Sequence, residues 1–124
     1  MRRVVIESPF GKNVDGSTAD ETTMLRNVAY LRAAIADCLR RGEAPFASHG
    51  LYPGALEDGI PEERRLGMEA GWEWMTAAHA VVVYVDHGVT PGMRGGIARA
   101  EALGLKIEER SIHYATPAIQ GGAP

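Results

Sequence analysis

The stretch Val81-Val-Val-Tyr-Val-Asp86, which continues as His87-Gly-Val-Thr-Pro-Gly-Met-Arg-Gly-Gly-Ile97, decides the fold class. Its mostly β-branched apolar run predicts a buried strand of a parallel sheet. Thr90 followed by Pro91 predicts the start of a helix, because proline is favoured at the first helical position. In open α/β sheets, ligands bind beyond the carboxyl ends of strands, where helix N-termini offer unpaired amides. The stretch therefore predicts where a ligand binds before it indicates which ligand.

The same alternation of strand and helix runs along the rest of the chain. Strands are expected at 3–7, 43–47, 80–85 and 106–110, and helices from 18 to 41, 61 to 78 and 91 to 103. The first helix is expected to begin with a capping box of Thr18 and Glu21 and to end at Gly42. Its predicted apolar stripe consists of Met24, Val28, Leu31, Ile35 and Cys38.

This alternation predicts an α/β, Rossmann-like fold: a small doubly wound parallel sheet of four or five strands flanked by helices. Pro45 favours an edge position for its strand, because proline cannot donate to a sheet ladder. We expect one domain over residues 1–114 and a C-terminal tail over residues 115–124.

Composition limits the classes of partner. The chain has 124 residues, 45% of them hydrophobic, and a formal net charge of −3. With that charge and no basic stripe, nucleic acid is not expected as a partner. The single cysteine, Cys38, allows no internal disulfide and is expected to be a buried, inert thiol. No signal peptide or membrane span is visible, so we expect a soluble cytoplasmic protein without a membrane partner.

Polar and aromatic residues follow the predicted strands and are the first candidate ligand-binding residues: Glu7, Ser8, Phe10, Ser48, His49, Tyr52 and Asp86. Glu7 and Asp86 are also candidate acid–base groups, because a carboxyl beside buried apolar surface has a raised pKa unless it is paired. Structural alternatives stay open for several of them: Glu7 as a solvated strand end or a partner for Arg26, Phe10 as core, and Asp86 as a turn residue.

The start of the third helix is a candidate anion site. Gly92, Met93, Arg94, Gly95 and Gly96 combine backbone amides, small residues and a positive charge, which suit a phosphate. The alternative is that these glycines only allow close packing of the helix on the sheet.

The second predicted helix carries both acidic and apolar residues. Glu69 and Glu73 share one of its faces and are either an acid–base pair or a solvated surface. Its methionines and tryptophans are expected to be core or a subunit interface. The sequence shows no spacing typical of a hydrolase triad or a metal site, and no cofactor is indicated.

Several of these segments together resemble the nucleoside 2-deoxyribosyltransferase-like superfamily, most closely a small, often phage-borne branch. The resemblance covers roughly residues 3–110 and rests on Glu7-Ser-Pro-Phe10, Glu43-Ala-Pro-Phe-Ala-Ser-His49, Glu62-Glu-Arg64 with Gly67, and Gly92-Met-Arg-Gly-Gly-Ile-Ala-Arg-Ala100. It implies cleavage or exchange of an N-glycosidic bond by a glutamate nucleophile at the start of the third helix. Gly96 matches that position here, and glycine supplies neither nucleophile nor base.

Three functional hypotheses follow. The first is a non-catalytic protein that binds a nucleotide-like small molecule, which in a phage setting would sequester a nucleotide immune signal. The alternative is an N-glycosidase or 2-deoxyribosyltransferase acting on (deoxy)nucleoside monophosphates, in which Glu7, Glu69 or Asp86 replaces the missing glutamate. The third is a structural subunit with a vestigial crevice. A homodimer or higher homo-oligomer is expected in each case.

Overall fold

The computed structural model describes residues 1–112, which contain four strands, three α-helices and one short 3-10 helix. In chain order these are β1 (Arg2–Glu7), α1 (Glu21–Arg40), β2 (Glu43–Phe46), η1 (Ser48–Gly50), α2 (Pro61–Met75), β3 (Ala80–Tyr84), α3 (Pro91–Ala102) and β4 (Lys106–Arg110). The tail expected over residues 115–124 lies outside the described residues.

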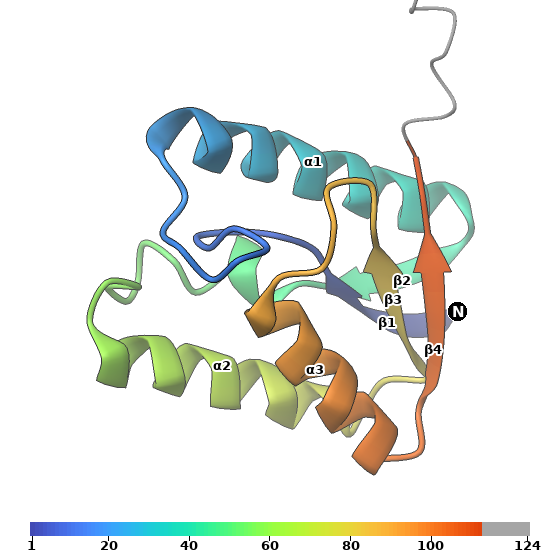
Figure 1. Cartoon of the computed structure of the whole chain (residues 1–124). Helices are drawn as coiled ribbons and strands as arrows, with labels where there is room; N and C mark the ends of the chain where they lie inside the picture. Colours follow the sequence, from blue (N-terminus) through green and yellow to red (C-terminus); the bar gives the residue numbers. More distant parts are fainter. Residues whose placement is uncertain (113–124) are drawn as a thin grey trace, which may run out of the picture.

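The four strands form one parallel sheet in the order β2-β1-β3-β4. Helix α1 covers one face of the sheet, and α2 and α3 cover the other (Figure 1). The predicted α/β class and parallel sheet are confirmed, and β2, which contains Pro45, is an edge strand as expected. Because the chain leaves β1 toward β2 on one side and later enters β3 on the other, the carboxyl ends of β1 and β3 form the topological switch point of the sheet.

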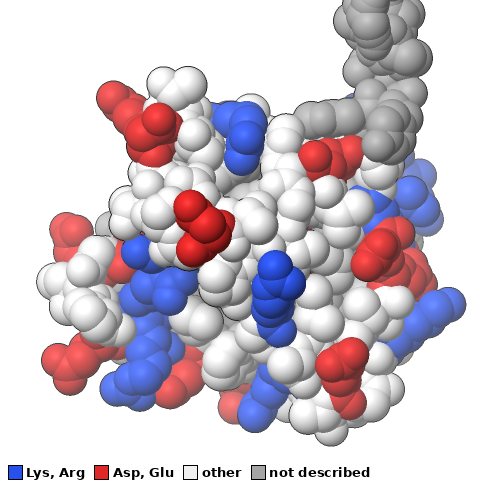
Figure 2. Space-filling model, in the orientation of Figure 1, with Lys and Arg blue, Asp and Glu red and all other residues white. Residues whose placement is uncertain are grey.

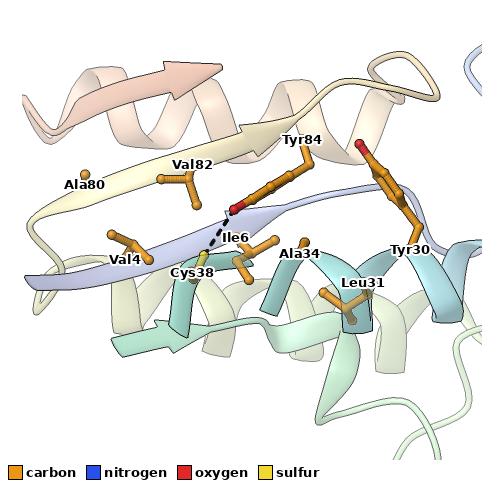
Figure 3. Packing of buried hydrophobic residues seen from close by; sticks show 9 residues of the cluster. All are labelled: Val4, Ile6, Tyr30, Leu31, Ala34, Cys38, Ala80, Val82 and Tyr84. Carbon is orange, nitrogen blue, oxygen red and sulfur yellow. Dashed lines mark hydrogen bonds between the residues drawn. The ribbon is translucent and has the colours of Figure 1, made fainter. Parts of the chain in front are cut away.

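Alternate residues of the central strands supply two separate cores. Val4 and Ile6 of β1 pack with Val82 and Tyr84 of β3 against α1, as Figure 3 shows. Val5 packs on the opposite face, in a cluster that includes Met75 of α2 and Met93 of α3. Cys38 is buried in the α1 cluster, as expected, with its sulfur 3.3 Å from the Tyr84 hydroxyl.

The boundaries of α1 correct part of the sequence reading. The cap is Asp20, whose carboxylate accepts a hydrogen bond from the Thr23 N–H at 2.7 Å, so the capping box expected at Thr18 is wrong. The helix ends before Gly42, whose φ of 80° supports the predicted C-terminal glycine. The expected stripe is only partly correct, because the residues buried in α1 are Asn27, Tyr30, Leu31, Ala34 and Cys38.

The other elements deviate by a few residues at most. Helix α2 stops at Met75, three residues before the expected Ala78, and α3 stops at Ala102, one residue before Leu103. Strand β3 ends at Tyr84 instead of Val85, and β4 spans the predicted residues 106–110.

A buried ion pair fastens the amino end of β2 to the last strand. The Arg110 guanidinium donates to both carboxylate oxygens of Glu43, at 2.8 and 2.7 Å. Arg2 also pairs with Glu43 and with Glu108. The guanidinium of Arg110 is the main cause of the lowered Glu43 pKa.

Elsewhere on the surface, charges of both signs are interspersed on the face shown in Figure 2. Within residues 1–112, no helix combines the length and the apolar character needed to span a lipid bilayer.

Candidate functional site

A pocket lies at the carboxyl ends of β1 and β2, between the N-terminus of α3 and one face of α2. It comprises about 700 Å³ of space, part of which is open to solvent, a size within the range of small-molecule sites. Predicted site residues that line it are Glu7, Ser8, Phe10, Ser48, His49, Gly92 and Met93. A second hollow beside it shares Phe10 and His49 and adds the predicted Tyr52.

Glu7 provides the deep polar group of the pocket. It is the last residue of β1, and its carboxyl makes no hydrogen bond or ion pair with another residue in the described part of the chain. The residue keeps partial exposure through the pocket, but the surrounding protein shields the carboxyl from bulk water. This desolvation raises the Glu7 pKa to about 8, so the carboxyl is mostly uncharged at neutral pH.

Gly96 of α3 makes the position of Glu7 possible. A Cβ atom at Gly96 would lie 2.2 Å from Glu7 Oε2 and 2.5 Å from its Cδ, and both distances are shorter than non-bonded contacts allow. The carboxyl of Glu7 therefore occupies the space that any side chain at residue 96 would need. At Gly95, in contrast, a Cβ would lie in ordinary contact, 3.6 Å from the Trp72 ring, so close packing does not require glycine there.

Ser8 and His49 form a hydrogen-bonded pair beside Glu7. The Ser8 hydroxyl lies 2.7 Å from His49 Nε2, and the two residues follow β1 and β2 respectively. Burial lowers the His49 pKa to about 4, so the imidazole is neutral at pH 7. The Phe10 ring meets the His49 ring edge-on, with centroids 6.4 Å apart. This side of the pocket therefore offers neutral hydrogen-bonding groups next to an aromatic face.

Close packing of η1 on α2 fixes that pair in place. A Cβ at Gly71 of α2 would lie 2.7 Å from the Cβ of Ser48, so only glycine allows η1 to approach so closely. Gly71 was not predicted from the sequence, because its role depends on which loop packs against the helix.

The face of α2 supplies residues that sequence reasoning assigned elsewhere. Met68 and Trp72, expected in the core or in an interface, line the pocket, while Met75 both lines it and belongs to the core. Arg64 lines the pocket as well, together with Lys12 and Asp58 from the loops. Arg64 appeared in the sequence only as part of the Glu62-Glu-Arg64 motif, and that motif was the signal that could have identified it.

Asp86 lies away from the pocket and has a structural environment. Its carboxylate accepts hydrogen bonds from the Tyr30 hydroxyl at 2.6 Å, the Ile112 N–H at 3.0 Å and the Ser111 hydroxyl. Its own N–H donates to the Tyr30 hydroxyl at 2.9 Å. These contacts tie the turn after β3 to α1 and to the segment after β4.

Two further candidates also lie outside the pocket. Arg94 is exposed on α3. Glu69 is exposed on α2, where it pairs with Arg65 at 3.0 Å and borders a wide, open hollow. Among residues 1–112, no group of three histidine, cysteine, aspartate or glutamate side chains is placed to hold a metal ion.

Comparisons with known proteins agree with the fold. The model of a family described as a domain of unknown function (DUF7768) matches residues 2–110. A solved structure of a 2-deoxyribosyltransferase from the psychrotolerant bacterium Bacillus psychrosaccharolyticus superposes with a TM-score of 0.60 at 18% sequence identity, over 88% of this chain and 72% of that one. No curated protein sequence matches. At this identity the likeness is one of fold, and it supports the deoxyribosyltransferase-like architecture inferred from the sequence.

Proposed function

Since the chain belongs to the DUF7768 family, a domain of unknown function, we propose its function from the pocket: it binds a nucleotide-like small molecule. The observation that carries this proposal is the combination of a neutral, unpaired carboxyl at the base of the pocket with aromatic and cationic residues at its walls. The carboxyl of Glu7 and the hydroxyl of Ser8 suit sugar hydroxyls or the edge of a base. The rings of Phe10 and Trp72 suit a base by stacking.

The test is incubation of the purified protein with a panel of nucleosides and nucleotides, followed by chromatography of each ligand before and after heat denaturation of the protein. We expect a ligand that is depleted from solution and returns intact on denaturation. A ligand at 100 times its Kd should also stabilise the protein by about 2.7 kcal/mol. A panel without any depletion or stabilisation would favour a structural subunit with a vestigial crevice.

A matched pair of variants locates the binding. Phe10→Ala removes a ring from the pocket, and we expect about tenfold weaker binding, the low end of a base–aromatic contact. Trp74→Ala removes an exposed ring of α2 that does not line the pocket and should leave binding unchanged. Equal losses in both variants would place the ligand elsewhere.

One observation favours a second candidate function, an N-glycosidase or 2-deoxyribosyltransferase acting on nucleoside monophosphates. The resemblance implies a glutamate at the position of Gly96, and the Glu7 carboxyl fills the space above this glycine. Of the three carboxylates considered as replacements, Glu7 alone lines the pocket. This candidate predicts free base in the chromatography, and loss of base release in Glu7→Gln.

Two finer proposals go with the binding function. Binding without turnover suits the sequestration of a nucleotide signal, a role that rests on the resemblance to phage-borne domains. We also propose that the protein forms a homo-oligomer, which would cover exposed apolar side chains of α2 such as Leu66 and Trp74. Size-exclusion chromatography with light scattering tests the oligomeric state.

A further inference from the structure

The N-terminus of α3 has few free donors for an anion. Pro91 has no N–H, the Met93 N–H donates to Thr90 Oγ1 at 3.3 Å, and the Arg94 N–H donates to the Thr90 carbonyl at 3.0 Å. Among the described residues this leaves the N–H of Gly92 in the first turn, and Gly92 lines the pocket. One amide is a weak anion site, so a charged group must supply most of the attraction.

Arg64 of α2 lies where such a charge is needed. A Cβ on Gly92 would be only 3.5 Å from Arg64 Nη2, so the guanidinium packs against the first turn of α3. It forms a long ion pair with Asp58, with 3.8 Å between Nε and Oδ2, and its Nη1 contacts the Met68 sulfur at 3.5 Å. Among residues 1–112 these are its polar contacts, so the guanidinium keeps donors for a ligand, and its planar fork matches phosphate oxygens.

The charge of the pocket also suits an anion. Lys12 and Arg64 are cationic, and Asp58 is the acidic residue that faces them. Glu7 lies in the same pocket as an unpaired carboxyl, and desolvation keeps it mostly uncharged at neutral pH. The deep carboxyl therefore adds little repulsion toward a phosphate at the mouth.

We propose that Arg64, together with the N–H of Gly92, binds the phosphate of the ligand, so that the pocket selects nucleoside monophosphates over nucleosides. This inference rests on the proposed binding function and replaces Arg94 with Arg64 as the phosphate-binding arginine. The base and sugar would then extend from the mouth toward Glu7, Ser8 and Phe10.

The test uses isothermal titration calorimetry to measure the affinity of nucleosides, their 5′-monophosphates and inorganic phosphate for the unmodified protein and four variants. We expect Arg64→Gln to weaken monophosphate binding about 10- to 100-fold, the equivalent of a charged hydrogen-bonding contact, and to leave nucleoside binding within about twofold. Arg65→Gln, one residue away and paired with Glu69 on the exposed face, is the matched control. Arg94→Gln should also bind like the unmodified protein.

The possible outcomes separate this inference from the proposed function. Two results would leave the binding function standing and overturn the role of Arg64. One is that nucleosides bind as tightly as monophosphates, and the other is that Arg94→Gln lowers the affinity for monophosphates more than Arg64→Gln does. Absence of binding by every compound would overturn both. Arg64→Lys, which keeps the charge without the planar fork, guards against misfolding of Arg64→Gln. We expect its monophosphate affinity to lie between those of the unmodified protein and Arg64→Gln. An unchanged affinity in a folded Arg64→Lys would refute the idea that the planar guanidinium donates two hydrogen bonds to the phosphate.

Discussion

Replacement of Glu7 by glutamine should stabilise the protein at neutral pH, because the folded pocket penalises a charged carboxylate. The Glu7 pKa rises from 4.5 to about 8 on folding. For an acid with a raised folded-state pKa, the neutral carboxyl's contribution to stability is complete below pH 4.5 and is lost as the pH rises toward 8. Between these pH values the free energy of unfolding falls by about 1.4 kcal/mol per pH unit, which amounts to about 3 kcal/mol at pH 7. Glu7→Gln keeps the shape of the side chain and remains neutral at every pH.

The assay is urea unfolding of both proteins at a series of pH values from 5 to 9. We expect Glu7→Gln to exceed the unmodified protein by about 1–3 kcal/mol at pH 7 and by less than about 1 kcal/mol at pH 5. Glu69→Gln, an exposed carboxylate paired with Arg65, is the control and should show no such growing difference. A Glu7→Gln difference that stays constant from pH 5 to 9 would refute the desolvation argument, as would a Glu7 carbon NMR titration centred near pH 4.5.

Four other substitutions test the packing around the site and the core. Gly96→Ala should displace the Glu7 carboxyl that lies against it and weaken nucleotide binding, whereas Gly95→Ala should leave binding intact and raise helix stability by about 0.5–1 kcal/mol; calorimetry and thermal unfolding measure the two effects. Tyr30→Phe removes a hydroxyl that both donates and accepts a hydrogen bond, and urea unfolding should show a loss of about 1–3 kcal/mol. Glu43→Ala leaves Arg110 buried without its main partner and should cost about 3 kcal/mol in the same assay; unchanged stability would show that the ion pair is energetically neutral.

The strands and most helix limits could be predicted because their signals are local. Buried β-branched runs mark β1 and β3, and glycine or proline stands at the ends of most elements. The cap of α1 could not be assigned in this way, since Thr18 and Asp20 both precede a suitable first turn. Its buried face was predicted only in part. Asn27 is buried because its amide donates to the Phe10 carbonyl at 2.7 Å, a partner seventeen residues away that no helical periodicity reveals.

The residues of the candidate site also fall into those that local signals predict and those that depend on packing. Glu7, Ser8 and His49 were predicted because the ends of parallel strands meet at one edge of the sheet. Arg64 and Gly71 were not predicted, because their roles depend on which turn of α2 faces α3 and η1. Asp86 occupies a strand end as well, but Tyr30 of α1 reaches its carboxylate, and the sequence alone does not show this contact.

The pairing of Glu7 with Gly96 bears on the choice between binding and chemistry. A carboxylate nucleophile must be ionised, and desolvation keeps Glu7 mostly protonated below a pH of about 8. Covalent catalysis by Glu7 would therefore strengthen as the pH rises through 8, whereas proton donation by Glu7 to a departing base would weaken over the same range. At neutral pH the protonated carboxyl is suited to donate and accept hydrogen bonds rather than to attack a sugar. The pocket thus has a carboxyl, supplied by β1, in the space next to Gly96. Its protonated state at neutral pH favours recognition of a ligand over attack on a sugar.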